Sequence, residues 1–228
     1  MSTAPIAPSS YPSRLETTPP DQLSRWLWLV KWLLIIPHVL VLIVLWIAFV
    51  ILSIIAFFAI LFTGRYPRGI FTFNVGVLRW SWRVGYYSAS AFATDAYPPF
   101  TLDEVPGYPA SFTVEYPERL SRGLVLVKWW LLAIPHYIVL SLLLGPQVGY
   151  TTEDQTRYQT HIGLIGILAL VAVVVLLFSG RYPRGIYDLV VGLNRWIYRV
   201  AAYAGLMTDR YPPFRLDMGP AEPVDPPQ

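Results

Sequence analysis

The chain has 228 residues and a formal net charge of +3, and 55% of its residues are hydrophobic while only 14% are charged. Soluble domains carry about 25% charged residues, so this composition indicates a membrane protein. The sequence has no cysteine, which excludes a disulfide, a thiolate metal site and a cysteine nucleophile. The small net charge gives no indication of nucleic acid as a partner.

The two ends of the chain predict flexible tails. Residues 1–10 open a segment rich in Pro, Ser and Thr. This segment has no basic region followed by an apolar one, so it does not resemble a cleavable signal peptide. Residues 218–228 have a similar composition, and we expect them to form a C-terminal tail.

An internal duplication organises the rest of the chain. The string Gly64–Ile70, here called the GRYPRG motif, recurs without change as Gly180–Ile186. Further strings match in the same order: Leu23-Ser24-Arg25 with Leu120-Ser121-Arg122, Leu29-Val30-Lys31-Trp32 with Leu126-Val127-Lys128-Trp129, Ile36-Pro37-His38 with Ile134-Pro135-His136, and Tyr97-Pro98-Pro99-Phe100 with Tyr211-Pro212-Pro213-Phe214. The matches define repeat 1 (residues 11–103), a linker (104–107) and repeat 2 (108–217).

The apolar part of repeat 2 is divided in two. Residues 124–144 and 161–178 would span roughly 31 and 27 Å as helices, and each length is close to the roughly 30 Å of the hydrocarbon core. A polar insertion at residues 145–160 separates them. We therefore expect a helical hairpin that crosses the membrane twice.

The apolar part of repeat 1 is uninterrupted and admits two interpretations. As one helix, residues 26–62 would be roughly 55 Å long, which is too long for a single crossing. In the first interpretation the segment turns near Leu45 and forms a second hairpin. In the second, residues 26–36 lie in the membrane interface, Pro37 breaks the helix, and residues 39–62 cross once.

The placement of charge favours the hairpin in repeat 1. Arg25 and Lys31 flank the start of the apolar segment, and Arg65 and Arg68 flank its end. A hairpin puts all four on the cytoplasmic side, as the positive-inside rule requires. The predicted fold is thus an all-α, multi-pass membrane protein with about four transmembrane helices in two hairpins and with both termini in the cytoplasm.

The segment after each GRYPRG motif carries polar residues at helical spacing. In repeat 1 these residues, which advance by 4, 7, 4, 7 and 4, are Arg68, Thr72, Arg79, Arg83, Ser90 and Thr94. The first three steps recur in repeat 2 with Arg184, Asp188, Arg195 and Arg199. Such a stripe on a Trp- and Tyr-rich helix is typical of an amphipathic helix in the bilayer interface. A crossing helix with its arginines turned inward is the alternative.

Three short strings alternate apolar and polar residues, as half-buried strands do. They are Phe100–Asp103, Ser111–Glu115 and Phe214–Asp217. We expect them to form a small β element on the cytoplasmic side.

Several of these motifs occur together in a known family. The GRYPRG motif, the upstream Leu-Val-Lys-Trp and Ile-Pro-His strings and the downstream Thr-Asp-x-Tyr-Pro-Pro-Phe string resemble domain-of-unknown-function family 4389 of bacterial membrane proteins. The resemblance covers both repeats. It implies an integral protein of the bacterial inner membrane, and it implies no particular activity.

Two histidines are the sharpest candidates for a cofactor site. His38 and His136 occupy matching places after a proline in an apolar segment. A pseudo-two-fold arrangement could bring both imidazoles to one axis, where they could ligate a haem or a metal. The alternative, which we favour, is that each imidazole donates a hydrogen bond to the backbone carbonyl that the proline leaves unpaired, or lies at the membrane interface. We therefore predict no cofactor and no metal.

The recurring charged residues have two expected roles. Asp95 and Asp209 are expected to cap a helix or to pair with a GRYPRG arginine. The arginines are candidates for binding lipid headgroups, because a guanidinium matches a phosphate bidentately. The candidates are Arg65, Arg68, Arg79, Arg83, Arg181, Arg184, Arg195 and Arg199.

No motif indicates catalysis. The sequence contains no P-loop, dinucleotide fingerprint or hydrolase elbow, and its apolar segments contain no Asp, Glu or Arg. We predict a non-enzymatic accessory or scaffold subunit that contacts anionic lipid and a partner membrane protein, or associates with itself. A small transporter or channel is the second hypothesis. A haem- or metal-carrying subunit that uses His38 and His136 is the third.

Overall fold

The computed structural model describes residues 11–20, 22–145, 147–152, 155–160 and 163–221, so the predicted N-terminal tail (1–10) and residues 222–228 lie outside the described residues. This part of the chain is mostly helical, with two two-stranded sheets. The helices are α1 (Trp28–Leu34), α2 (Ile36–Thr63), α3 (Arg68–Tyr87), α4 (Leu124–Val127), the π-helix η1 (Lys128–Leu132), α5 (Ile134–Leu144), α6 (Leu164–Ser179) and α7 (Arg184–Ala204). The strands are β1 (Ser13–Thr17), β2 (Ala110–Val114), β3 (Gln147–Thr152) and β4 (Gln155–Thr160).

The apolar segment of repeat 1 forms a short helix and then a long one. Pro37 lies in the first turn of α2, where its missing N–H costs no helical hydrogen bond. α2 continues through Leu45 and Trp46, so the predicted hairpin of repeat 1 is wrong. The sequence around these two residues contains no Gly or Pro that would favour a turn. The 28 residues of α2 give a length of about 42 Å.

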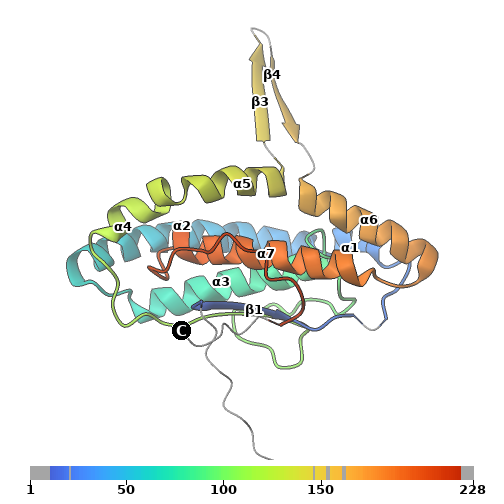
Figure 1. The fold of residues 1–228 in the computed structure, drawn as a ribbon, viewed down its shortest axis with the longest axis horizontal. Coiled ribbons are helices and arrows are strands. Elements are labelled where there is room, and N and C mark those ends of the chain that lie inside the picture. The colour runs from blue at the N-terminus through green and yellow to red at the C-terminus, as the bar shows by residue number, and fades with distance from the viewer. Residues whose placement is uncertain (1–10, 21, 146, 153–154, 161–162, 222–228) are drawn as a thin grey trace, which may run out of the picture.

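The apolar segments of repeat 2 do not form a helical hairpin either. α5 and α6 follow one another along the same edge of the molecule, and the β3–β4 hairpin projects from their junction (Figure 1). Their ends are in contact, because a Cβ on Gly163 would overlap the backbone of Leu144 and Gly145. The polar insertion is therefore a β-hairpin that leaves one interrupted line of helix, and this line takes the place that α2 has in repeat 1.

Two helices of the described chain are long and apolar enough to cross a membrane. They are Ile36–Thr63 and Leu124–Ser141, and the second runs through α4, η1 and most of α5. α6 is apolar but shorter. Four transmembrane helices are thus not supported. Each apolar segment that was predicted to turn back on itself as a hairpin instead continues in one direction, as α2 in repeat 1 and as α5 followed by α6 in repeat 2.

The helices lie in layers, with their axes along the long dimension of the molecule (Figure 1). α5 and α6 lie on the side from which the β3–β4 hairpin projects, α2 and α7 lie at the next level, and α3 and then β1 lie toward the opposite side. The core contains Trp82 and Tyr86 of α3, Val190 and Val191 of α7, and Ile60 of α2. The two arginine-bearing helices thus form where predicted, but they are the centre of the fold rather than isolated helices in the interface.

The small sheet on the side opposite α2 joins the two repeats. β1 and β2 pair antiparallel, and the pair is centred on Leu15 and Phe112, which occupy matching places in the two repeats. β1 packs on α7 and β2 packs on α3, so each strand crosses to the other repeat. The predicted strand at Ser111–Glu115 is thus present, but its partner is β1. The strings Phe100–Asp103 and Phe214–Asp217 form no strand.

Substitution of Gly163 by alanine tests the contact between α5 and α6. The added Cβ has no space beside the backbone of Leu144, so we expect Gly163→Ala to cost about 1–3 kcal/mol of stability. Gly185→Ala is the matched control, because nothing lies within 4 Å of a Cβ at Gly185. Thermal unfolding in detergent measures both variants. Equal melting temperatures would mean that α5 and α6 do not meet.

Candidate functional site

A buried lysine and an aspartate form the same ion pair in each repeat. Lys31 Nζ lies 2.9 Å from Asp95 Oδ1 and donates to the Thr94 carbonyl at 2.6 Å. The other carboxylate oxygen of Asp95 accepts the Ser24 N–H at 2.5 Å. Burial lowers the pKa of Lys31, and the hydrogen bond and charge of Asp95 oppose that shift. The pair ties α1 to the segment after α3.

Repeat 2 reproduces this arrangement at matching positions. Lys128 Nζ lies 2.8 Å from Asp209 Oδ1, and Asp209 Oδ2 accepts the Ser121 N–H at 2.6 Å. The predicted capping role of the aspartates is wrong, because α1 and α4 have no side-chain cap and the Ser24 and Ser121 N–H groups lie before these helices. The cationic partners of both aspartates are the lysines of the Leu-Val-Lys-Trp strings rather than the GRYPRG arginines.

Each histidine lies inside an aromatic enclosure. His38 stacks on Phe100 with ring centroids 3.9 Å apart, and its Nδ1 accepts the Trp80 Nε1–H at 3.1 Å. Tyr97 packs beside it at 4.9 Å. His136 is enclosed in the same way by the matching residues Trp196, Tyr211 and Phe214. The recurrence of the Ile-Pro-His and Tyr-Pro-Pro-Phe strings in both repeats therefore reflects packing.

The structure does not bring the two histidines together. α2 and α5, whose first turns hold His38 and His136, begin at opposite ends of the molecule (Figure 1). The two enclosures share no residue. Within the described residues, no group of three or more His, Cys, Asp or Glu side chains could hold a metal ion. The geometry therefore lends no support to a haem or metal shared by the two imidazoles.

The eight candidate arginines divide into two groups. Four lie on α3 and α7 toward the sheet, and of these Arg83, Arg195 and Arg199 are buried. Arg79 donates to the carbonyls of Phe112 and Leu102 at 2.8 and 2.9 Å. The helical spacing of these arginines was interpreted correctly, but their stripe faces protein carbonyls.

Arg195 repeats the contacts of Arg79 from the other half of the molecule. Its Nε and Nη2 donate to the Leu15 carbonyl at 3.1 and 2.9 Å, and Nη2 also donates to Gly219 at 3.0 Å. Arg199 pairs with Asp217 at 2.6 Å. The start of the predicted C-terminal tail is thus bound to the core.

The other four arginines belong to the GRYPRG motifs and are exposed: Arg65, Arg68, Arg181 and Arg184. In each motif the first glycine ends an apolar helix in the left-handed conformation, with φ of 70° at Gly64 and 68° at Gly180. The motif tyrosine then enters the core, where burial raises the pKa of Tyr66 to about 12. The motif is therefore a corner that leaves its arginines on the surface.

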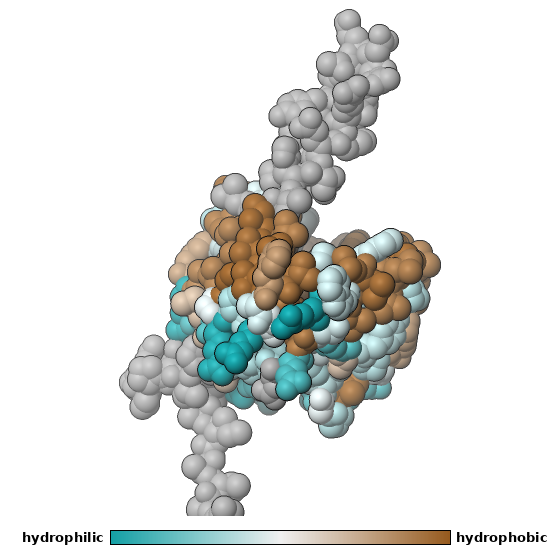
Figure 2. Space-filling model, turned by 90° about the vertical axis from the view of Figure 1, so that its right-hand side faces the viewer, coloured by the Kyte–Doolittle hydropathy of each residue, from teal (hydrophilic) through white to brown (hydrophobic). Residues whose placement is uncertain are grey.

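The surface of the molecule is apolar on one side (Figure 2). Most side chains of α2 point outward, and Val44 in its middle is 65% exposed. α1, η1, α5 and α6 continue this surface, ending at Phe178, which is 81% exposed. A soluble protein rarely exposes an apolar surface of this extent.

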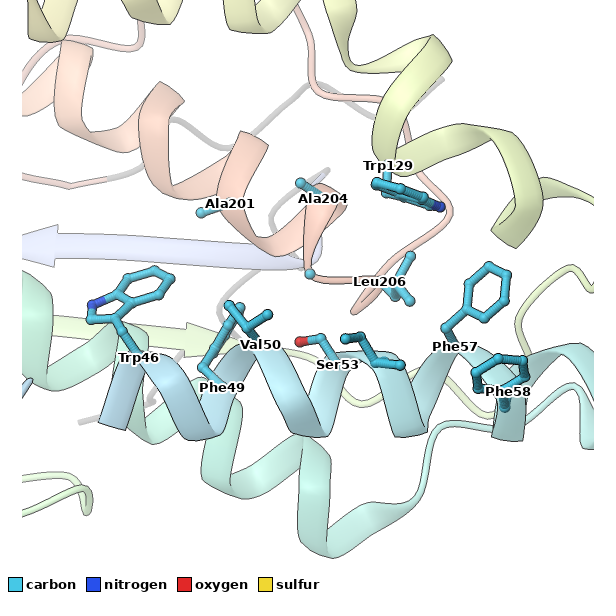
Figure 3. Close-up of a pocket in the computed structure, with 12 residues that line it drawn as sticks. Trp46, Phe49, Val50, Ser53, Phe57, Phe58, Trp129, Ala201, Ala204 and Leu206 are labelled. Atoms are coloured by element: carbon cyan, nitrogen blue, oxygen red, sulfur yellow. The ribbon is translucent and has the colours of Figure 1, made fainter. Parts of the chain in front are cut away.

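An apolar groove runs along this surface between α2 and α7 (Figure 3). It has a volume of about 600 Å³. Its walls are aliphatic and aromatic side chains with the hydroxyl of Ser53 between them, and its ends are marked by Trp46 and by Phe57 and Trp129. No sequence pattern indicated this groove, because its walls come from both repeats.

Replacement of Arg195 tests the role of the buried arginines. Arg195→Leu removes the guanidinium that donates to the Leu15 and Gly219 carbonyls, and we expect a loss of roughly 2–4 kcal/mol of stability. Arg184→Leu, on the exposed end of the same helix, should change stability by less than about 0.5 kcal/mol. Thermal unfolding in detergent measures the difference. Similar small effects of both variants would contradict a structural role for Arg195.

Comparison with known proteins assigns a family and no activity. Residues 25–101 and 158–215 match the domain of unknown function DUF4389, and together the two segments cover more than half of the chain. They fall one in each repeat, which fits a two-copy arrangement. No curated protein and no solved structure matches the chain at a significant level. The chain belongs to the DUF4389 family.

Proposed function

We propose that this protein is a non-enzymatic membrane subunit whose helices lie flat in one leaflet, with the GRYPRG arginines at the level of the headgroups. The observation that carries the proposal is the continuous apolar surface of α1, α2, α5 and α6. Burial of such a surface in lipid removes it from water, which is favourable by about 25 cal/mol per Å².

The position of the β1–β2 sheet supports a flat orientation. The sheet lies beside the middle of the helices rather than at one of their ends (Figure 1). Next to it, Glu104 and Glu115 have side chains that are each 61% exposed. If α2 stood upright in the membrane, these carboxylates and their ion-pair partners Arg79 and Arg14 would lie near the bilayer centre, where each charge costs up to about 3 kcal/mol. With the helices flat, they remain in water.

The flat orientation also accounts for the charge pattern that led us to expect a hairpin. Arg25 before α1 and Arg65 after α2 are both exposed cations at the ends of the apolar surface. A helix that lies in the plane of the membrane keeps both ends at the same interface. The positive-inside rule is then satisfied although the chain does not turn.

The β3–β4 hairpin supports the expected contact with a partner membrane protein. It leaves the apolar side of the molecule at the junction of α5 and α6 (Figure 1). β3 and β4 pair only with each other among the described strands, so each leaves one edge unpaired. With the helices flat, this polar hairpin enters the bilayer, where neither open strand edges nor the charge of Arg157 is stable unless a protein partner covers it.

A channel or transporter is the competing proposal. Upright helices from several copies could turn their sheet sides toward a shared aqueous pore, which would keep Glu104 and Glu115 in water. The two proposals differ in topology, because upright helices place the two ends of α2 on opposite sides of the membrane.

Cysteine labelling separates the two orientations, and the native chain contributes no cysteine of its own. With flat helices, a membrane-impermeant maleimide should label Arg25→Cys, Arg65→Cys and Glu115→Cys from one side of sealed vesicles. Val44→Cys is the control, because a residue in lipid should react only with a lipid-soluble maleimide. Labelling of Arg25→Cys and Arg65→Cys from opposite sides would refute the flat orientation and favour the channel.

Photo-cross-linking tests the scaffold role. A photoreactive residue at Thr152 in β3 should cross-link to another protein in native membranes, whereas the same residue at Val44 should react with lipid. A product of twice the mass of the chain would identify self-association in place of a partner. If neither position gives a protein cross-link, the scaffold role is wrong.

A further inference from the structure

We propose that the corner at the C-terminal end of α2 binds the phosphate of an anionic lipid headgroup through Arg65, Arg119 and Arg122, and that the lipid's acyl chain occupies the groove between α2 and α7. This inference rests on the proposed membrane association and names the ligand of one GRYPRG corner. Only Arg65 belongs to the motif. The other two arginines come from the opposite repeat.

The corner is a formed concavity. Gly64 ends α2, and its carbonyl accepts the Leu120 N–H at 2.9 Å, which fixes the segment before α4 against the end of α2. The resulting pocket has a volume of about 410 Å³ and is lined by Thr63, Gly64, Arg65, Arg119, Leu120 and Arg122. Arg122 lies directly over the glycine, with Nε 3.5 Å from where a Cβ would be.

The charge in this pocket is uncompensated. Its lining contains three guanidinium groups and no carboxylate. In the part of the chain that the structure describes, none of the three guanidinium groups donates a hydrogen bond or forms an ion pair, and the hydrogen bonds between Arg65 and the Thr63 hydroxyl involve only the Arg65 backbone. The end of α2 accounts for only part of this charge, because a helix C-terminus carries about half a negative charge. The remaining positive charge of the three arginines therefore makes this pocket a site for a polyanion.

Arginine geometry favours phosphate in particular. A guanidinium donates two parallel hydrogen bonds to a phosphate, and several of them around one pocket can share its oxygens. All three arginines are exposed, so an incoming headgroup would reach them without any rearrangement of the chain. A phosphomonoester headgroup carries up to two negative charges, so it neutralises more of the positive charge of this pocket than a phosphodiester does.

A lipid source is favoured over free phosphate by what adjoins the pocket. Phe62, which is 72% exposed, immediately precedes its first lining residue. The apolar groove of about 600 Å³ ends nearby at Phe57 and Phe58 of α2 and at Trp129. An acyl chain attached to a headgroup in the basic pocket would pass Phe62 and enter the groove that Figure 3 shows along α2.

The matching corner at the end of α6 is weaker by one cation. There Arg181 takes the place of Arg65, and Arg25 lies over Gly180, with Nη2 2.5 Å from a Cβ position. The alignment of the Leu-Ser-Arg strings places Gln22 where repeat 2 has Arg119. The molecule therefore contains one corner with three arginines and one with two, which provides an internal control.

Native mass spectrometry of the whole protein in mild detergent tests the site. With phosphatidic acid, phosphatidylglycerol and phosphatidylcholine supplied in turn, we expect affinity to fall in that order. The double variant Arg119→Gln/Arg122→Gln should bind phosphatidic acid about tenfold less tightly or worse, which is roughly 1.4 kcal/mol. The double variant Arg25→Gln/Arg181→Gln removes the same charge from the other corner and should retain most of the binding. Thermal unfolding confirms that both variants are folded.

Two further arms identify the ligand. Ala204→Phe narrows the groove, so it should weaken binding of long-chain phosphatidic acid but leave binding of glycerol phosphate unchanged. Inorganic phosphate should compete only at far higher concentration than the lipid. Equal competition by inorganic phosphate would overturn the lipid assignment. Unchanged binding in Arg119→Gln/Arg122→Gln, or an equal loss in both double variants, would overturn the site.

These outcomes are independent of the flat orientation. Lipid binding in detergent can fail while the cysteine-labelling pattern holds, in which case the site alone is wrong. If instead the labelling fails and the selective binding persists, the orientation is wrong and the site stands.

Discussion

The fold depends on the satisfaction of backbone carbonyls by buried guanidinium groups. Strands β1 and β2 form a sheet of only two strands, and their outer carbonyls face α3 and α7. Arg79 and Arg195 reach these carbonyls from the helices, each on the strand of the other repeat. An unpaired buried carbonyl costs about 1–3 kcal/mol, so each arginine holds a strand in place as well as neutralising its polarity. The central helices, the sheet and the loops after Phe100 and Phe214 all meet at these two side chains.

Local sequence signals predicted the helices well but not their surroundings. The spacing from Arg68 onward and the proline before it predicted helix α3 and its start correctly, but the predicted stripe continued to Thr94, whereas α3 ends at Tyr87. Periodicity cannot distinguish a stripe that faces phosphate from one that faces carbonyls, because both need a cationic donor every turn or two. That is why Arg83 and Arg195 were expected at the membrane surface and lie in the core. Whether these arginines face lipid phosphate or protein carbonyls depends on where β1 packs, and no local sequence pattern carries that information.

The hairpins were wrong for a different reason. The length of residues 26–62 was compared with the thickness of a bilayer, which assumes that an apolar helix stands upright. An apolar segment that lies along the surface of a fold has no such limit, and α2 runs unbroken for its 28 residues. Two of the arginines in the candidate lipid site could not be predicted from the local sequence either. Arg119 and Arg122 are more than fifty residues from Gly64 in the chain, and only the exchange of segments between repeats brings them to it.

The exchanged strands have a consequence for the ancestry of the chain. Since β1 completes repeat 2 and β2 completes repeat 1, one repeat alone would lack the strand that its own arginine holds. A protein with a single copy of this unit could obtain the missing strand only by exchanging strands with a second molecule. Gene fusion would then have turned an exchange between two chains into one within a chain. The predicted linker at 104–107 would then mark the junction, and such a fusion would make assembly independent of concentration.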